Sequence, residues 1–537
     1  MSEDLGPEGK QPPTIDCPPT WTLTSLAAIA DVALGKTPGK DDYRSEGKCK
    51  IVKYRDLGDD REIVWTNREK GFIECTRAQT MNLRRLSRGD VLISASAHSS
   101  EIIGRKVLYV HYLPDDFDAV YYVGEILCIR VAQEETPDLP KLLNYFFQSI
   151  KGYKTIQAKV HGVHLIASRA AGMVVPVPPK ANQQRIVSKI DELFSRIEEG
   201  ERALERVQKL VRRYRQSVLK AAVTGELTRD WREKNNGQLE SGEVRLARIH
   251  KAHREAWEKS ELDKMKAKGI TLANDGWKVK YEEPGDVVTD YLGDLPGEWQ
   301  RVRIDAVGEV QLGRQRSPAH HEGEFMRPYL RVANVHQERI DISDVMSMNF
   351  TPEEFVTYSL RRGDILLNEG QSKELIGRPA MYGDEVPGAC FTNTLVRFRA
   401  TSAVLPEFAL IVFLHYMKSG DFQKIAKITT NIAHLGAGRF AEMSFPVPRE
   451  EEQRQIVDRV DRQSSVYSQL IAEVVGRRRH VSSLRQSVLK AAFSGALVPQ
   501  DSSDESASLL LERIAHERSD ASVQPRRRPK NRTQERV

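Results

Sequence analysis

The sequence has few cysteines, and none of them form a close pair. Five cysteines occur among 537 residues, and no two have the CxxC spacing that zinc sites and redox-active dithiols use. An odd, scattered set is typical of proteins in a reducing cytosol, where thiols stay free. We therefore expect no metal site and no redox centre in this chain.

Long apolar segments are also missing. The longest apolar run, FALIVFL at 408–414, is bounded by Glu407 and His415. It is far shorter than the roughly 20 residues that a membrane-spanning helix needs. The opening residues MSEDLGPEGKQPPTIDCPP are polar and proline-rich, unlike a signal peptide. These features predict a soluble, cytoplasmic protein.

The usual catalytic signatures fail. Gly35-Lys36-Thr37 resembles the end of a phosphate-binding loop, but Ala30 stands where that motif needs its first glycine. Glu369 and Lys373, which follow Asp364, do not have the Glu-x-Lys spacing of a common nuclease core, and neither HExxH nor GxSxG occurs. The net charge of +6 permits a nucleic-acid partner, although only clustered charge would argue for one. Together these observations favour a binding protein over an enzyme.

A repeat, by contrast, is plainly present. RQSVLKAAVTGEL begins at 215 and RQSVLKAAFSGAL begins at 485, an offset of 270 positions. The same offset relates Pro176-Val177-Pro178 to Pro446-Val447-Pro448, and His164 to His434. A constant register over some 60 residues indicates a duplicated segment rather than a chance match.

Upstream of this segment the register drifts. The offset is 278 between Trp21 and Trp299, 274 between RGDVL (88–92) and RGDIL (362–366), and 273 between the two IGR motifs, 103–105 and 376–378. Altered loop lengths in diverged copies produce such a drift. Each half of the chain therefore has a variable front part and a rigidly spaced rear part.

The rear part of each copy predicts a long helix. Apolar residues recur at heptad spacing from Ile186 to Ala221 and from Ile456 to Ala491, interrupted at Gly200, Gln463 and Arg477. Each helix would have about 40 residues and a length on the order of 60 Å. The narrow apolar stripe favours pairing with the other copy, with packing on its own front domain as the alternative. We favour an antiparallel pair over a parallel one, because the chain then needs no long return.

The predicted fold class is α+β. Strand-like runs such as DVLIS and DILLN alternate with glycine- and serine-rich turns, so two mixed α/β domains would be joined by two helices in an antiparallel coiled coil with a pseudo-twofold internal repeat. The expected divisions are a disordered N-terminus (1–18), a first front domain (19–180), a first helix (181–225), a charged connector (226–294), a second front domain (295–450), a second helix (451–495) and a disordered polar and basic tail (496–537). We interpret residues 243–269 of the connector as a solvated linker helix, with partner docking as the alternative. The tail ends QPRRRPKNRTQERV and would add non-specific affinity for DNA.

Polar loop residues in the front domains suit DNA contacts. Arginine and lysine pair with guanine or phosphate, and glutamine and asparagine pair with adenine. A solvated loop is the alternative for each residue, and a buried structural role is a further one for the two Gly-Arg pairs. The candidates are Lys36, Thr37, Lys40, His98, Arg105, Lys106, His161, His164 and Arg169 in the first copy, and Arg314, Gln315, Arg316, Gln371, Lys373, Arg378, Asn431, His434 and Arg439 in the second.

These motifs give residues 19 to 497 a resemblance to the specificity (S) subunit of type I restriction–modification enzymes. The signs are the RGD(V/I)L and IGR motifs, Pro-Val-Pro followed by Gln-(x)-Ile-Val, and the twice-repeated RQSVLKAA ending. The resemblance implies two target recognition domains, each reading one half of a split double-stranded DNA sequence, and spacer helices that set the gap.

The same resemblance implies partners. Two methyltransferase (M) subunits and restriction/translocase (R) subunits would dock on the chain and bring S-adenosylmethionine, ATP and Mg, while the chain itself would catalyse nothing. Two alternatives remain open from the sequence. One is a fused DNA-modification enzyme with an unrecognised catalytic site, and the other is a coiled-coil interaction protein without a nucleic-acid role.

Overall fold

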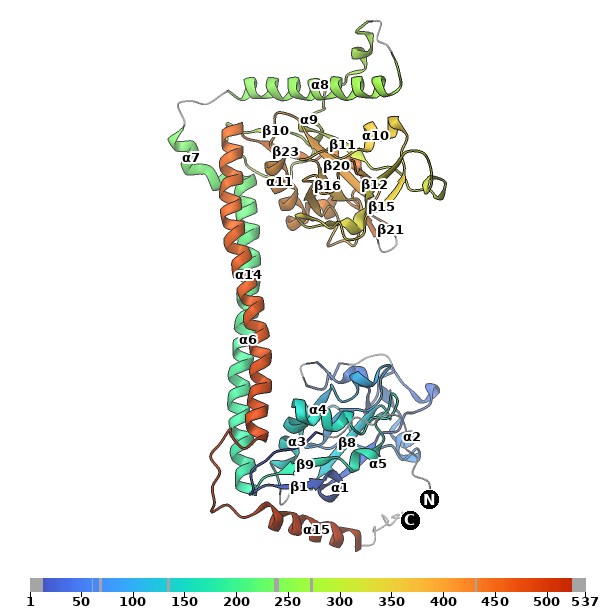
Figure 1. The fold of residues 1–537 in the computed structure, drawn as a ribbon, viewed down its shortest axis with the longest axis vertical. Helices are drawn as coiled ribbons and strands as arrows, with labels where there is room; N and C mark the ends of the chain where they lie inside the picture. The colour runs from blue at the N-terminus through green and yellow to red at the C-terminus, as the bar shows by residue number, and fades with distance from the viewer. Residues whose placement is uncertain are drawn as a thin grey trace, which may run out of the picture. The chain divides into compact units, whose positions relative to one another are not determined.

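The chain divides into two compact units. The computed structural model describes residues 13–59, 61–66, 70–132, 136–235, 241–270, 274–429 and 432–523. Unit 1 comprises Met1–Leu204 and Gly476–Val537, and unit 2 comprises Glu205–Val475. Each unit holds one front domain and part of each of two long helices, α6 (Lys180–Val223) and α14 (Glu450–Phe493), as the colours of Figure 1 trace.

The front domain of unit 1 is built on three small sheets. A four-stranded antiparallel sheet has the order β2-β8-β5-β6, a three-stranded sheet has the order β4-β3-β7, and β1 pairs with β9. Short helices cover the sheets. The elements are β1 (Thr22–Ser25), α1 (Leu26–Ile29), β2 (Ala30–Leu34), β3 (Cys49–Val52), β4 (Phe72–Ile73), α2 (Cys75–Thr80), β5 (Val91–Ser94), β6 (Val107–Tyr109), β7 (Ala119–Tyr122), β8 (Ile126–Val131), α3 (Leu139–Gln148), α4 (Ile150–Gln157), α5 (Ala167–Ala171) and β9 (Val174–Val177).

The front domain of unit 2 repeats this topology. Its four-stranded sheet has the order β11-β20-β16-β18, the corresponding three-stranded sheet has the order β15-β12-β19, and β10 pairs with β23. Unit 2 adds a second three-stranded sheet, β17-β22-β21, and the pair β13-β14. The elements are β10 (Gln300–Arg303), α9 (Ile304–Val307), β11 (Gly308–Leu312), β12 (Met326–Leu330), β13 (Val335–His336), β14 (Arg339–Ile340), β15 (Met346–Asn349), α10 (Pro352–Tyr358), β16 (Ile365–Asn368), β17 (Gly370–Gln371), β18 (Pro379–Met381), β19 (Cys390–Phe391), β20 (Leu395–Ala400), α11 (Pro406–Ser419), α12 (Asp421–Ile425), β21 (Lys427–Thr429), β22 (Ile432–His434), α13 (Ala437–Ala441) and β23 (Ser444–Val447).

The duplication extends to strand register. In unit 1, Thr22 of β1 lies opposite Val177 of β9, and in unit 2, Gln300 of β10 lies opposite Val447 of β23. In the two corresponding three-stranded sheets, β4-β3-β7 and β15-β12-β19, the central strand has one parallel and one antiparallel neighbour. Two mixed α/β domains with one plan are therefore present, as the sequence predicts.

Within each unit, α6 and α14 lie antiparallel. In unit 1, Arg485 of α14 forms an ion pair with Glu198 at 3.1 Å and lies over the Phe194 ring at 4.9 Å. In unit 2, the Tyr214 hydroxyl donates to the Gln463 amide oxygen at 2.7 Å, and Arg459 donates to the Leu227 carbonyl. Gln463, which interrupts the apolar heptad pattern, is therefore the hydrogen-bond partner of an aromatic residue on the facing helix.

The polar tail is helical over part of its length, contrary to expectation. Residues Ala507–Val523 form α15, and its Leu510 and Ile514 are buried in the core of unit 1. Arg185 pairs with Asp504, and the Trp21 indole donates to Gln500 at 3.1 Å. The predicted disorder of the tail is wrong here because Ala507, Leu510 and Ile514 lie on one face of α15 and are all buried. Residues 524–537 lie outside the described part of the chain.

The N-terminal segment shows a similar difference. Ile15 and Cys17 are partly buried against the core of unit 1, so the predicted disorder does not hold for residues 13–18. Residues 1–12 lie outside the described residues.

The connector also packs more tightly than predicted. It contains α7 (Arg229–Lys234) and α8 (Gly242–Ala267), and α8 matches the expected helix at 243–269 closely. Its Arg245, Ile249 and Ala252 are buried, with Ile249 and Ala252 in the core of unit 2. The interpretation as a solvated linker helix is therefore wrong: one face of α8 completes the second front domain.

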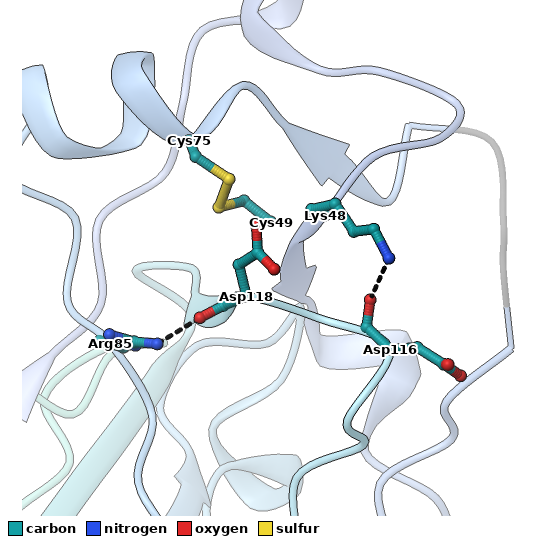
Figure 2. Close-up of a disulfide and its surroundings, with 6 residues drawn as sticks. All are labelled: Lys48, Cys49, Cys75, Arg85, Asp116 and Asp118. Atoms are coloured by element: carbon teal, nitrogen blue, oxygen red, sulfur yellow. Dashed lines mark hydrogen bonds between the residues drawn. A yellow bond between two sulfur atoms is a disulfide. The ribbon is translucent and has the colours of Figure 1, made fainter.

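Two of the cysteines form a disulfide. Figure 2 shows Cys49, at the start of β3, bonded to Cys75, at the start of α2, although the two are 26 positions apart in the sequence. The neighbouring loop is held by Lys48, which donates to the Asp116 carbonyl at 3.2 Å, and by Arg85, which donates to the Asp118 carbonyl. The expectation of free, scattered thiols is wrong for this pair, because spacing in sequence does not reveal proximity in space.

The disulfide should stabilise unit 1. Closing a loop of 26 residues corresponds to about 3.5 kcal/mol in the chain-entropy model. We expect dithiothreitol to lower the denaturant midpoint at which unit 1 unfolds. Hydrogen exchange of the full chain measures this midpoint. A Cys49→Ser/Cys75→Ser variant should have the lower midpoint without reductant, and dithiothreitol should not change it. A Cys17→Ser variant should behave like the wild type. Equal midpoints with and without reductant in the wild type would contradict this expectation.

Candidate nucleic-acid interface

Four loop segments form one edge of the front domain in unit 1. The Gly35 amide donates to the Ile126 carbonyl at 3.1 Å, the Ala95 amide to the Glu125 carbonyl at 2.8 Å, and the Leu165 amide to the Ala95 carbonyl at 2.8 Å. The segments near 35, 95, 125 and 165 are thereby joined side by side. We call this set the loop edge of unit 1.

Unit 2 has the same loop edge, built by the same bonds. Gly313 donates to the Leu395 carbonyl at 3.1 Å, Glu369 to the Thr394 carbonyl at 2.9 Å, and Leu435 to the Glu369 carbonyl at 2.8 Å. Each bond has its counterpart in unit 1. The two loop edges therefore share a backbone frame while carrying different side chains.

A glycine permits the first of these contacts. A Cβ added to Gly35 would lie 2.2 Å from the Tyr122 carbonyl oxygen, and one added to Gly313 would lie 2.1 Å from the Thr392 carbonyl oxygen. The pattern shared by Leu34-Gly35-Lys36 and Leu312-Gly313-Arg314 therefore reflects a close backbone approach and not a phosphate-binding loop. It also places Lys36 and Arg314 at matching points of the chain.

A histidine is held on each loop edge. The Ser96 hydroxyl lies 3.0 Å from His164 Nδ1, and Glu369 Oε2 lies 3.0 Å from His434 Nδ1. The backbones correspond as well, because Ser96 bridges His164 and Gly370 of β17 pairs with His434 of β22. The predicted candidates His164 and His434 are thus brought to equivalent places.

The other candidates of unit 1 fall into two groups. Four have polar partners: Lys36 donates to the Met81 carbonyl, Thr37 accepts from Gly124, Arg105 donates to the Glu101 carbonyl, and Lys106 pairs with Asp59 at 3.1 Å. Lys40, His98, His161 and Arg169 are exposed. Of all these, Thr37 and His161 are placed by their contacts beside the loop edge, since His161 bridges His164.

In unit 2 the structure removes one candidate. Arg314 is 7% exposed, pairs with Glu354 at 2.7 Å and lies over the Phe350 ring at 5.0 Å. Its guanidinium ties β11 to α10, so we correct the prediction that it contacts DNA: its role is structural. Exposed Gln315 and Arg316 follow it directly, and Arg316 lies over the Tyr329 ring at 5.5 Å.

The remaining candidates of unit 2 surround His434. Gln371 belongs to β17, and Lys373 is exposed just beyond it. Arg439 donates to the carbonyls of Ile425 and His434 at 2.7 and 2.9 Å, which fixes the strand that carries His434. Asn431 lies outside the described residues.

The Arg378 guanidinium is held by a buried asparagine. With the Asn368 amide oriented to satisfy both groups, its oxygen accepts from Arg378 at 3.1 and 3.2 Å. Asn368 is fully buried, and partial burial lowers the pKa of the Arg378 guanidinium from its usual range.

The glycines of the two Gly-Arg pairs have a structural reason. A Cβ on Gly104 would lie 2.6 Å from Ile156, and one on Gly377 would lie 2.2 Å from Phe422. Both glycines also have positive φ, +76° and +68°, which disfavours any residue with a side chain. The arginine that follows each is thereby positioned by a tight turn.

Sequence reasoning missed the segments near 125 and 394 and the role of Glu369. The available signal was positional, because all three directly adjoin strand-like runs that match between the copies. Among the residues that the structure describes, no group of three or more His, Cys, Asp or Glu side chains is placed to hold a metal ion. None of the described helices is both long and apolar enough to cross a bilayer.

Comparison with known proteins identifies the family. The model of the type I restriction modification DNA specificity domain matches residues 18–206 and 296–474. The type I restriction enzyme EcoBI specificity subunit of Escherichia coli is 26% identical over 431 residues, covering 75% of this chain and 78% of that protein. The EcoKI specificity subunit of Escherichia coli K12 is 22% identical over 523 residues, covering 94% and 96%.

A solved structure shares the fold. A chain from a type I R-M system superposes with a TM-score of 0.56 at 17% identity and covers 89% of this chain and 99% of its own length. The two family matches fall on the two repeated segments and together span more than half of the sequence. The chain therefore belongs to the type I restriction–modification DNA specificity family, as a specificity subunit that carries the family domain twice.

Proposed function

We propose that the chain reads a bipartite DNA sequence, with one loop edge for each half. The observation that carries this proposal is the pair of matched loop edges, whose backbone hydrogen bonds correspond while their side chains differ. A shared frame presents both edges to the same kind of ligand. Different side chains on that frame, such as Ala95 and Ser96 in unit 1 where unit 2 has Glu369 and Gly370, select different bases.

We further propose that α6 and α14 act as a spacer, which we call the ruler, between the two front domains, which we call the readers. The antiparallel contacts inside each unit support a coiled coil, and the matched topology of the units supports a pseudo-twofold repeat. A helix of 44 residues has a length of about 66 Å. On this proposal the helices set the number of unread base pairs between the half-sites.

The spacer helices also offer a surface for partners. Within unit 2 the apolar side chains Val207, Leu210 and Tyr214 of α6, and Val466 and Leu470 of α14, are 40–60% exposed. Exposed apolar side chains mark interaction sites where they form a contiguous patch. We propose that methyltransferase subunits, two in number, dock on the spacer and that restriction subunits join them. S-adenosylmethionine, ATP and Mg would be bound by those partners and not by this chain.

The proposal predicts the result of a domain exchange. In cells that carry the complete system, mapping of methylated adenines should give one bipartite motif with a fixed gap. Exchange of residues 19–180 for the front domain of another such subunit should change one half of the motif and leave the other half and the gap intact. A change in both halves, or in neither, would contradict the assignment of one reader to each half.

The alternative, a fused modification enzyme, has its own test. Purified full chain incubated with labelled S-adenosylmethionine and genomic DNA is expected to transfer no methyl groups until the methyltransferase subunits are added. Transfer by the chain alone would support the alternative.

A further inference from the structure

The two loop edges carry histidines at matching places. His164 and His434 are related by the sequence offset of 270. In unit 1 a hairpin is closed by the bridge between His161 and His164, and in unit 2 by the pairing of β21 with β22. Each hairpin therefore ends with its histidine beside the strand that leaves the four-stranded sheet.

Within the part of the chain that the structure describes, both rings are held through Nδ1. Nδ1 of His164 meets the Ser96 hydroxyl and Nδ1 of His434 meets Glu369 Oε2, each at 3.0 Å. His164 is exposed, and the His434 side chain is 41% exposed while Glu369 is 16% exposed. The nitrogen that remains for a ligand in each ring is Nε2.

This arrangement suits a base edge better than a phosphate. A phosphate contact needs positive charge with little directional demand, which exposed Lys373 and Arg169 offer nearby. A base contact needs a hydrogen-bonding atom in a fixed direction, and a ring fixed at Nδ1 by a second side chain provides one.

We propose that His164 and His434 each read one base of their own half-site through Nε2. This inference rests on the proposed function, in that each loop edge faces one half-site. It assigns a specificity-determining role to two named residues, one in each reader.

The orienting partners give the two histidines different hydrogen-bonding character. A carboxylate only accepts, so Glu369 fixes the proton on Nδ1 of His434, and Nε2 of the neutral ring then presents a lone pair. That lone pair can accept from the exocyclic amino group of adenine or cytosine in the major groove. The Ser96 hydroxyl can donate or accept, so His164 keeps both options.

Amide substitutions separate the two ring nitrogens. A glutamine amide reaches the place of Nε2, whereas an asparagine amide reaches only the place of Nδ1. In the intact system, His434→Asn should relax one position in the second half-site, with methylation of the original motif falling about ten-fold, as expected for one lost hydrogen bond. His434→Gln should retain that position better, and His164→Asn should relax one position in the first half-site only.

The controls test folding and location. Thermal unfolding of each purified full chain should match the wild type, since asparagine can still bond Glu369 or Ser96. His336→Asn is a matched control, because His336 lies in unit 2 on β13, outside the loop-edge segments, and faces Asp341 at 3.6 Å. It should leave the methylated motif unchanged.

The possible outcomes separate a failure of this inference from a failure of the proposed function. If the wild-type system gives no bipartite motif, the proposed function itself fails. If the wild type gives the motif and both asparagine variants keep it base for base, at full or uniformly reduced methylation, the histidines do not read bases and the inference is overturned.

Discussion

Replacement of Glu452 by alanine is expected to lower the free energy of unfolding of unit 2 by about 3–5 kcal/mol, because it strands a buried arginine. Glu452 lies in the first turn of α14 and is 1% exposed. Its carboxylate accepts from Arg232 at 2.5 Å, from the Thr228 hydroxyl at 2.7 Å and from the Trp299 indole at 2.9 Å.

These contacts join three parts of unit 2 that are distant in sequence. Trp299 precedes β10, Thr228 and Arg232 follow α6, and Glu452 begins α14. Arg232 also lies over the Trp299 ring at 5.7 Å. Loss of the carboxylate therefore removes the charge partner of Arg232 and two hydrogen-bond acceptor atoms at once. It weakens the packing of the start of α14 against the second front domain.

Hydrogen exchange of the full chain measures this effect. Amides of β10 and β23 should exchange faster by a factor of about 100 or more in Glu452→Ala, whereas those of β1 and β9 in unit 1 should be unchanged. Glu451→Ala is the matched control, since Glu451 has the same charge, adjoins Glu452 and is exposed. Equal protection in the two variants would show that the buried network contributes little.

The repeated motifs were informative about the fold because several of them carry structural contacts. The RGD motif illustrates this. Asp90 is 1% exposed and accepts from Arg130 at 2.7 Å, and Asp364, equally buried, accepts from Arg399 at 2.7 Å. Both motifs therefore fasten two neighbouring strands of the four-stranded sheet. Residues that stay the same in both copies are those that the common backbone fold requires. In this chain they include the ion pairs and the close backbone approaches.

The long helices could be predicted because their signal is local. The heptad pattern indicated both helices, and the predicted bounds, 181–225 and 451–495, agree with α6 and α14 to within two residues. Helix α15 and the disulfide could not be predicted in the same way, because each depends on a partner far away in the sequence. Ile514 is buried only because the first front domain offers a core, and Cys49 meets Cys75 only because β3 and α2 fold together.

The candidate site was predictable in part for the same reason. His164 and His434 stood out by the constant offset, but nothing in the sequence joins Glu369 to His434 across 65 positions. Arg314 appeared equivalent to Lys36, yet it is buried against Glu354, because α10 of unit 2 supplies a carboxylate at that point. Residue type alone does not separate a solvent-facing arginine from a structural one.

Removal of one heptad from both spacer helices is expected to give the largest effect on DNA recognition. Seven residues correspond to about 10.5 Å of helix, or roughly three base pairs of DNA. The deletions should lie between Glu198 and Tyr214 in α6 and between Gln463 and Arg485 in α14, so that the contacts at both ends are kept. The bases read should stay the same while the gap shortens.

The magnitude follows from bivalent binding. When both half-sites bind at once, the second contact is intramolecular, and loss of simultaneous engagement costs about 10²–10⁴-fold in affinity. Binding of the shortened protein to the original target should fall by that factor. Deletion from α6 alone should be worse than the paired deletion, because it breaks the antiparallel register and thereby destabilises the spacer itself.

Insertion of three heptads in each helix tests the ruler from the other direction. It adds about 31 Å, close to the 34–36 Å of one DNA turn, so both readers again face the same side of the duplex. We expect adenine mapping to return the original half-sites with a gap longer by about nine base pairs, and methylation stronger than in the one-heptad deletion, whose half-sites are rotated by about a third of a turn. An unchanged gap in either variant would mean that the helices do not measure the distance, and the separation of the readers would then have to be fixed by the partner subunits.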